Sequence, residues 1–261
     1  MHKKEDVFDK IWNQYAELTP QATKIQNLLK GRGESVENDH VAYRSISLKG
    51  FGLKELCEPF EEMGYKIKGN YNFKEKKLVA VHLETASPKD PKVFLSEIRF
   101  KELSTEAQRL FEKALYYVEP PKKFELLTKG CFWEASYETY KKLYKESEYA
   151  AWFYAYGFCA NHFTVNVNKL NSFEDLEGLN KFIESNGFSL NDSGGKIKGS
   201  KEVFLEQSST KASSKKIKFT DGEFEIPSCY YEFAKRHPMQ NGELYQGFVT
   251  TSADKIFEST N

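Results

Sequence analysis

The sequence has no long hydrophobic run, no excess of either charge and few cysteines. No stretch approaches the roughly 18 apolar residues of a membrane-spanning helix, and the N-terminus is charged where a signal peptide would be apolar. Lys and Arg together number 38, as do Asp and Glu, so the chain lacks the basic excess that general nucleic-acid binding requires. We therefore expect neither a membrane span nor a nucleic-acid partner.

The four cysteines belong to no C-x-x-C pair, which argues against a zinc knuckle or a thiol-redox motif. Unpaired thiols are typical of a reducing compartment, so we expect a cytoplasmic protein with reduced cysteines. Of the 261 residues, 39% are hydrophobic and 15% are aromatic. This composition can build the core of a single domain over residues 1–261.

The order of sequence patterns predicts an α+β fold. Residues 5–30 carry apolar residues at helical spacing that Pro20 interrupts, and they are predicted to form two helices. A strand then begins near Asn38, a helix follows at about residues 53–63, and a second strand opens at Gly64.

The same order returns in the second half of the chain. His40 precedes Gly64 by 24 residues and His162 precedes Gly187 by 25, and a strand and a helix fill each interval. Two further strands are predicted in each half, at 78–84 and 93–99 and at 202–207 and 229–236. Because a repeat of this size is a fold-level signal, we predict two β-α-β-β-β modules, at residues 36–102 and 158–261.

Between the modules lies a predicted helical insert at residues 103–157. Aromatic stripes at helical spacing usually pack in a core. We expect this of Phe111, Tyr116, Tyr137, Tyr140 and Tyr144.

Three side chains that could bind a metal share one local pattern. His40, His162 and Glu232 each lie on a predicted strand, where residues i and i+2 share a face. A small residue follows each of them on that face, which leaves room beside the candidate ligand. These small residues are Ala42, Thr164 and Ala234.

The repeat indicates how these side chains would meet. His40 and His162 occupy equivalent positions, so a pseudo-two-fold arrangement of the modules would bring their imidazoles together. Two histidines and one carboxylate suit a non-haem Fe(II) oxygenase, although zinc accepts the same ligands. Glu232 is the predicted third ligand. Its rough counterpart in the first module is Glu97, for which we expect a structural role. His82 has no counterpart in the second half, and we expect it outside the ligand set.

Arg44 shares the strand face of His40, two positions beyond Ala42. A guanidinium beside a metal can hold a carboxylate through two parallel hydrogen bonds. The alternative interpretation of Arg44 is an ordinary surface ion pair.

Four segments together resemble the DUF1338 family: residues 39–45 (DHVAYRS), 93–98 (VFLSEI), 199–210 (ending in LEQSST) and 231–236 (YEFAKR). Its characterised members are 2-oxoadipate dioxygenase/decarboxylases, also called 2-hydroxyglutarate synthases. They are similar in fold to the vicinal-oxygen-chelate enzymes, which are built from paired β-α-β-β-β modules around a metal on a curved sheet. The resemblance runs from about residue 35 to the end of the chain.

The resemblance implies specific roles for residues of this sequence. His40, His162 and Glu232 would hold Fe(II), and Arg44 would bind the carboxylate of a small 2-oxo acid. We also expect His82 and Gln207 to contact the substrate. The implied reaction uses O2 to decarboxylate and hydroxylate the 2-oxo acid, with 2-oxoadipate giving 2-hydroxyglutarate and CO2.

Two rival functions remain open at this point. One is a vicinal-oxygen-chelate isomerase or hydrolase that uses another divalent metal. The other is a non-catalytic metal-binding module. The sequence does not predict the oligomeric state.

Overall fold

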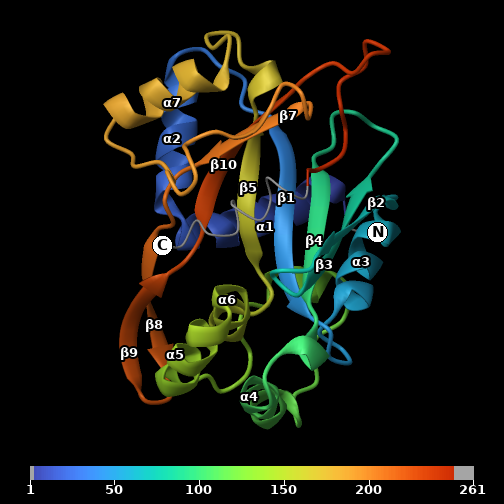
Figure 1. The fold of residues 1–261 in the computed structure, drawn as a ribbon, viewed down its shortest axis with the longest axis vertical. Coiled ribbons are helices and arrows are strands. Elements are labelled where there is room, and N and C mark those ends of the chain that lie inside the picture. Colours follow the sequence, from blue (N-terminus) through green and yellow to red (C-terminus); the bar gives the residue numbers. More distant parts are fainter. Residues whose placement is uncertain (1–2, 250–261) are drawn as a thin grey trace.

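The computed structural model describes residues 3–249 and has the predicted mixed α+β architecture (Figure 1). Two helices lead the chain, α1 (Lys4–Leu18) and α2 (Pro20–Gly31). Pro20 stands at the start of α2, where its missing N–H would have had no partner within the helix. Pro20 therefore separates the two helices, as the sequence predicts.

Eight strands form one curled sheet in the order β2-β3-β4-β1-β5-β10-β7-β6. In chain order these strands are β1 (Asn38–Ile46), β2 (Lys66–Phe73), β3 (Leu78–Glu84), β4 (Lys92–Ile98), β5 (Ala160–Asn166), β6 (Lys198–Ser200), β7 (Leu205–Ser209) and β10 (Tyr230–Arg236). β1 and β5 run antiparallel at the centre, and each has a parallel neighbour, β4 for β1 and β10 for β5. The strand order outward from the centre is therefore the same in both halves.

The remaining helices pack around the sheet, and three of them lie between its two halves in chain order. They are α3 (Leu53–Glu62), α4 (Thr105–Leu115), α5 (Tyr137–Glu146), α6 (Glu148–Tyr156) and α7 (Leu176–Ser185), with short 3-10 turns at Phe100–Glu102, Lys123–Thr128 and Val167–Lys169. Residues 149–156 of α6 are all buried. A helix that is apolar on every side belongs inside a protein, and α6 accordingly lies within the fold.

The two faces of the sheet have different roles. α1 lies behind the sheet (Figure 1), where the rings of Trp12 and Tyr15 each lie 5.1 Å from the ring of Phe163 on β5. Because side chains alternate along a strand, His162 and Thr164 face the opposite, concave side. The apolar back of β5 thus anchors the strand, and its front is left for polar residues.

Several expectations from the sequence are wrong in detail. No strand opens at Gly187 in the described chain; the pairing nearby is an isolated bridge between Leu190 and Thr210, and β6 is a three-residue strand. Gly194 and Gly195 have φ angles of 67° and 99°, a left-handed backbone that interrupts a strand. The following strand, β7, begins at Leu205 instead of at residue 202.

Two other features of the fold differ from the expectation. A hairpin of β8 (Ser214–Phe219) and β9 (Gly222–Pro227) lies outside the predicted elements, and it forms a separate two-stranded sheet. Phe111 and Tyr140 are buried as expected, but Tyr116 is 75% exposed. It follows the last residue of α4, beyond the helix face that packs on the core.

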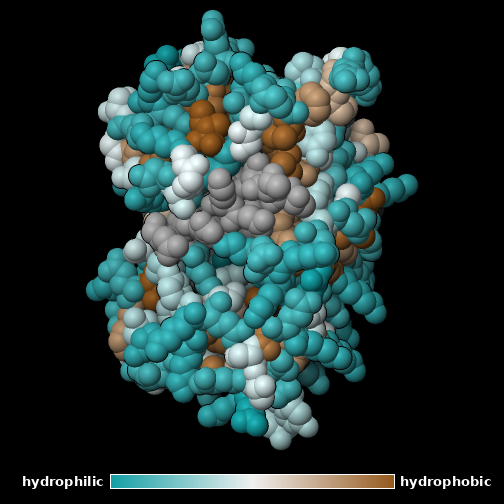
Figure 2. Space-filling view, viewed as in Figure 1, coloured by the Kyte–Doolittle hydropathy of each residue, from teal (hydrophilic) through white to brown (hydrophobic). Residues whose placement is uncertain are grey.

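The described part of the chain contains no helix that is long and apolar enough to span a membrane. Figure 2 shows one face of the molecule as largely hydrophilic, with hydrophobic residues in small separate patches. Both findings agree with the polar composition of the sequence.

Candidate metal centre

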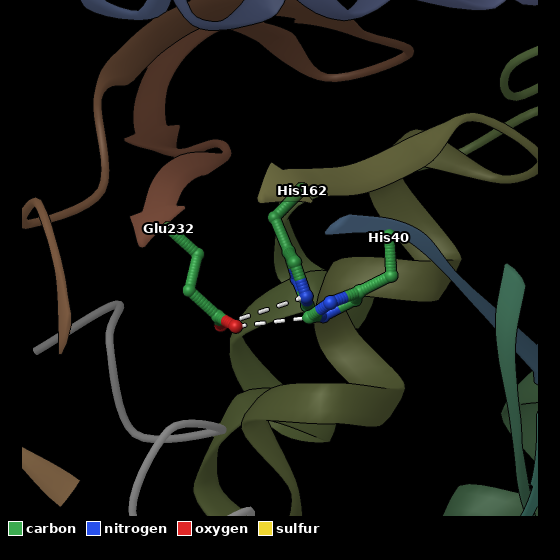
Figure 3. Close-up of side chains that lie close together, drawn as sticks. All are labelled: His40, His162 and Glu232. Carbon is green, nitrogen blue, oxygen red and sulfur yellow. Dashed lines mark ion pairs between the residues drawn. The ribbon is translucent and has the colours of Figure 1, made fainter. Parts of the chain in front are cut away.

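Three side chains from three neighbouring strands point toward one another on the concave face of the sheet (Figure 3). His40 comes from β1, His162 from β5 and Glu232 from β10, and their potential ligand atoms all lie within 4.8 Å of one another. The two imidazole centroids are 5.5 Å apart. The predicted convergence of the two histidines is therefore confirmed.

The strand register explains this arrangement. Thr164 on β5 is the neighbour of both His40 on β1 and Glu232 on β10. Its hydroxyl oxygen lies 3.1 Å from Nε2 of His40 and 3.3 Å from Oε1 of Glu232. His162 lies in the next row, opposite Ala42. A larger side chain at position 164 would occupy the space between the first histidine and the carboxylate.

Each histidine is oriented by the residue that precedes it. The pairing of β1 with β5 is irregular beside both histidines, so that Asp39 and Asn161 have no direct pairing partner there. Nδ1 of His40 lies 2.8 Å from the Asp39 carboxylate, and Nδ1 of His162 lies 3.0 Å from Oδ1 of Asn161. Because both oxygens accept hydrogen bonds, the Nε2 atoms are left as lone-pair donors toward the centre.

Burial sets the protonation of this site. It lowers the pKa of His162 well below its usual value, and the nearby charges of His40 and Arg44 lower it further. Burial raises the pKa of Glu232, although His40 and hydrogen bonds from Gln207 and Thr164 oppose the shift. A metal requires neutral imidazole and ionised carboxylate. A bound cation would therefore favour the ionised form of Glu232, and His162 would stay neutral.

The spacing of the donor atoms fits a single metal ion. Oε1 of Glu232 lies 3.4 Å from Nε2 of His40, and Oε2 lies 3.6 Å from Nε2 of His162. Two ligands at about 2.1 Å from one metal are about 3.0–3.5 Å apart at octahedral to tetrahedral angles. Both carboxylate–imidazole distances are thus close to those of two ligands on one ion, and all three donors lie within 4.8 Å of one another.

Arg44 is the most unusual group near this centre. It is 1% exposed, and none of its three side-chain nitrogens has a hydrogen-bond partner among residues 3–249. Its guanidinium lies over two aromatic rings of α6, 4.9 Å from the centroid of Tyr149 and 5.0 Å from that of Trp152. The surface ion pair considered as an alternative is therefore wrong. A buried cation without an acceptor is unfavourable, so an anionic partner would stabilise this guanidinium.

The remaining predicted residues have other partners in the structure. Nε2 of Gln207 donates to Oε1 of Glu232 at 2.6 Å. His82 lies 2.7 Å from the Tyr71 hydroxyl through Nδ1 and 2.9 Å from Glu84 through Nε2, and it is not one of the three clustered ligands. Substrate contacts of Gln207 and His82 stay predictions.

Glu97, the alternative third ligand, lies on β4, and its side chain reaches the start of α3. Its Oε2 accepts a hydrogen bond from the backbone N–H of Leu53 at 2.8 Å. A carboxylate at this position satisfies a free N–H of the first helical turn. Glu97 thus has a structural partner away from the cluster.

The sequence does not predict the hydrogen-bond network of Asp39 and Arg236 beside the candidate ligand His40. Asp39 accepts hydrogen bonds from Nε and Nη2 of Arg236 at 2.7 and 2.8 Å. Burial alone would raise the pKa of Asp39, but the charge of Arg236 and its hydrogen bonds hold this pKa well below its usual value. Both residues lie within the motifs that carry the family resemblance, yet no pattern in a single sequence indicates that they meet.

Comparison with known proteins identifies the family. The profile of the 2-oxoadipate dioxygenase/decarboxylase family matches residues 5–129 and 121–245. The chain belongs to this family. A relative from Oryza sativa subsp. japonica, named 2-oxoadipate dioxygenase/decarboxylase, chloroplastic/amyloplastic, is 35% identical over 275 residues, which cover 95% of this chain and 76% of the relative. The resemblance inferred from the sequence motifs is confirmed.

Solved structures of similar proteins have the same fold. A hydroxyglutarate synthase from Oryza sativa in complex with 2-oxoadipate is 33% identical, with a TM-score of 0.91 over 98% of this chain and 91% of that chain. A protein from Shewanella frigidimarina described as a hydrolase is 45% identical, with a TM-score of 0.90 over 96% and 99%. A glyoxalase-superfamily protein from Ralstonia eutropha, 19% identical with a TM-score of 0.77 over 91% and 83%, shares the fold alone.

Proposed function

We propose that the chain is an Fe(II)-dependent dioxygenase that converts 2-oxoadipate to 2-hydroxyglutarate and CO2. The observation that supports this proposal most is the buried guanidinium of Arg44, which has no hydrogen-bond acceptor among residues 3–249. Arg44 lies on the strand face that also presents the candidate ligand His40. The family, and the rice synthase named as a complex with 2-oxoadipate, support a 2-oxo acid as the anion. Both atoms of O2 enter the product, one in the carboxylate formed as CO2 leaves and one as the hydroxyl.

Three of the residues would bind the metal, and Arg44 would bind the substrate. His40, His162 and Glu232 would hold Fe(II), since their donor types are those of the facial triad, which leaves other positions open. Iron bound there supplies activation of O2 next to the 2-oxo acid. Arg44 binds a substrate carboxylate through two parallel hydrogen bonds and so fixes the orientation of the acid. The burial of all four residues excludes water, which strengthens this charge pairing.

The finer expectations from the sequence belong to the same proposal. The equal strand order of the two halves supports two vicinal-oxygen-chelate modules that meet at β1 and β5. Gln207 orients Glu232 through its hydrogen bond, and a direct contact of Gln207 or His82 with the substrate is proposed as well. A cytoplasmic location stays a prediction, because the plant relatives are named chloroplastic.

An oxygen-consumption assay with isotope analysis tests the function. Protein loaded with Fe(II) under anaerobic conditions is mixed with 2-oxoadipate or with 2-oxohexanoate, which lacks the distal carboxylate. We expect one CO2 for each O2 consumed and, with 18O2, two labelled oxygens in the 2-hydroxyglutarate. Product formation without O2 uptake would instead favour a hydrolase or isomerase, the class to which the description of the Shewanella relative points.

The choice of carboxylate ligand has its own test. Glu232→Ala removes one of three candidate ligands, so iron binding and turnover should both be lost. Glu97→Ala is the matched control, because its carboxylate contacts the start of α3, and this variant should keep its iron. Iron content is measured after gel filtration. Loss of iron in Glu97→Ala but not in Glu232→Ala would show that the wrong strand was chosen.

A further inference from the structure

Arg236 is held in a network that reaches His40 from one side. Two of its nitrogens donate to the carboxylate of Asp39 at 2.7 and 2.8 Å. That carboxylate also meets Nδ1 of His40 at 2.8 Å, and all three residues are at most 4% exposed. A carboxylate that is itself fixed by hydrogen bonds fixes the ring of a metal-binding histidine in turn.

The third nitrogen of Arg236 reaches a different part of the chain. Nη1 donates to the carbonyl oxygens of Tyr245 and Gly247 at 3.0 and 2.8 Å. The ring of Phe248, next in sequence, lies 4.8 Å from the ring of His40 in an edge-to-face contact. The contacts therefore form a closed loop that begins and ends at His40.

The second histidine has no such arrangement within residues 3–249. Nδ1 of His162 meets the neutral side chain of Asn161, and Nδ2 of Asn161 has no hydrogen-bond partner in that part of the chain. The ring of His162 instead stacks on Tyr230, with centroids 4.7 Å apart. The arginine network is thus specific to one of the two candidate ligands.

We propose that Arg236 is a positioning residue that couples the orientation of His40 to the C-terminal segment Tyr245–Phe248. Through Asp39 it holds the imidazole, and through the two carbonyls it holds the segment that packs on the same imidazole. The coupling to metal binding rests on the proposed function, whereas the anchoring of the segment does not. A change that removes the guanidinium should therefore loosen the segment and weaken the metal site together.

The test uses the full-length double variant Asp39→Asn/Arg236→Gln, which leaves neither partner as an unpaired buried charge. The introduced amide oxygen would still accept a hydrogen bond from Nδ1 of His40, and a circular-dichroism melt checks that the variant is folded. We expect cobalt(II), used in place of iron, to bind about 10- to 100-fold more weakly. In metal-free protein, chymotrypsin should cleave after Tyr245 at least about tenfold faster, because two hydrogen bonds from a charged donor are lost.

Arg99→Gln is the matched control, since Arg99 is partly exposed and pairs with Glu102 near the surface. It should leave both measurements within about twofold of the wild-type protein. In the folded double variant, a cobalt affinity or a cleavage rate within about twofold of wild type overturns the coupling. Cleavage is measured without metal or substrate, so a failed oxygenase assay would not affect that result.

Discussion

Arg44 and Arg236 are both buried, at 1% and 3% exposure, and each lies four residues after a candidate metal ligand. Their surroundings differ completely. The guanidinium of Arg236 makes four hydrogen bonds, two to Asp39 and two to backbone carbonyls. The guanidinium of Arg44 makes none within residues 3–249 and lies over two aromatic rings. Because a buried guanidinium needs acceptors, we propose that Arg44 is completed by a ligand, whereas the guanidinium of Arg236 has its acceptors within residues 3–249.

The largest difference should appear in stability. Arg236→Met leaves the Asp39 carboxylate buried without its cation, and removing one partner of a buried pair costs about 3–5 kcal/mol. The free energy of unfolding is measured in urea. Arg99→Met serves as the control, because exposed pairs contribute less than about 1 kcal/mol. Equal small losses in the two variants would mean that Asp39 does not depend on Arg236.

Activity should depend most directly on Arg44. Arg44→Lys keeps the charge but cannot form the planar two-bond contact with a carboxylate. We expect a loss of about 2–5 kcal/mol in transition-state stabilisation, or roughly 30- to several-thousand-fold in kcat/KM for 2-oxoadipate. Iron content should stay near that of the wild-type protein, because Arg44 is not a ligand. Near-normal turnover by Arg44→Ala would contradict the carboxylate contact.

Ligand binding should distinguish the two arginines at equilibrium. With cobalt-loaded wild-type protein under anaerobic conditions, 2-oxoadipate at 100 times its Kd should stabilise the fold by about 2.7 kcal/mol. Arg44→Met should lose this stabilisation at the same ligand concentration, since the acceptor-free guanidinium is gone. The midpoint of thermal unfolding, measured with and without the acid, checks this prediction. An undiminished shift in Arg44→Met would place the carboxylate elsewhere.

The smallest expected effect is on the stability of Arg44→Met, and it should be opposite in sign to the effect of Arg236→Met. In the absence of ligand, Arg44→Met replaces an unpartnered buried cation by an apolar side chain of similar length. The free energy of unfolding should therefore rise by about 1–2 kcal/mol. Urea denaturation of the metal-free protein measures it. A loss of stability would show that the rings of Tyr149 and Trp152 already satisfy the guanidinium.

Much of this arrangement could be predicted from the sequence. The spacing of His40 and His162 from the following glycines places both histidines on equivalent strands, and the small residue Thr164 indicates the face. The irregular pairing at Asp39 could not be predicted, because strict alternation places neighbouring residues on opposite faces. The acceptor-free state of Arg44 also depends on distant residues, and local sequence patterns do not report such contacts.

The hairpin of β8 and β9, in contrast, has a signal in the local sequence. Thr220 and Asp221 form a two-residue connection between two runs of alternating polar and apolar residues, and Gly222 begins β9. A connection of this length between alternating runs is typical of a tight hairpin. The signal is therefore local, although the repeat interpretation assigns no element to these residues. The strand expected at Gly187 is a different case. A glycine followed by an aromatic residue resembles the start of the second strand in the first half of the chain. Gly194 and Gly195, with their left-handed backbone, interrupt a strand in this region.

The candidate ligands are widely separated in chain order, at positions 40, 162 and 232. A nascent chain emerging from a ribosome therefore carries the first histidine for most of its synthesis before the carboxylate appears. Arg236, which completes the network around that histidine, emerges later still. A metal ion can therefore meet all three candidate ligands only after nearly all of the described chain has been synthesised.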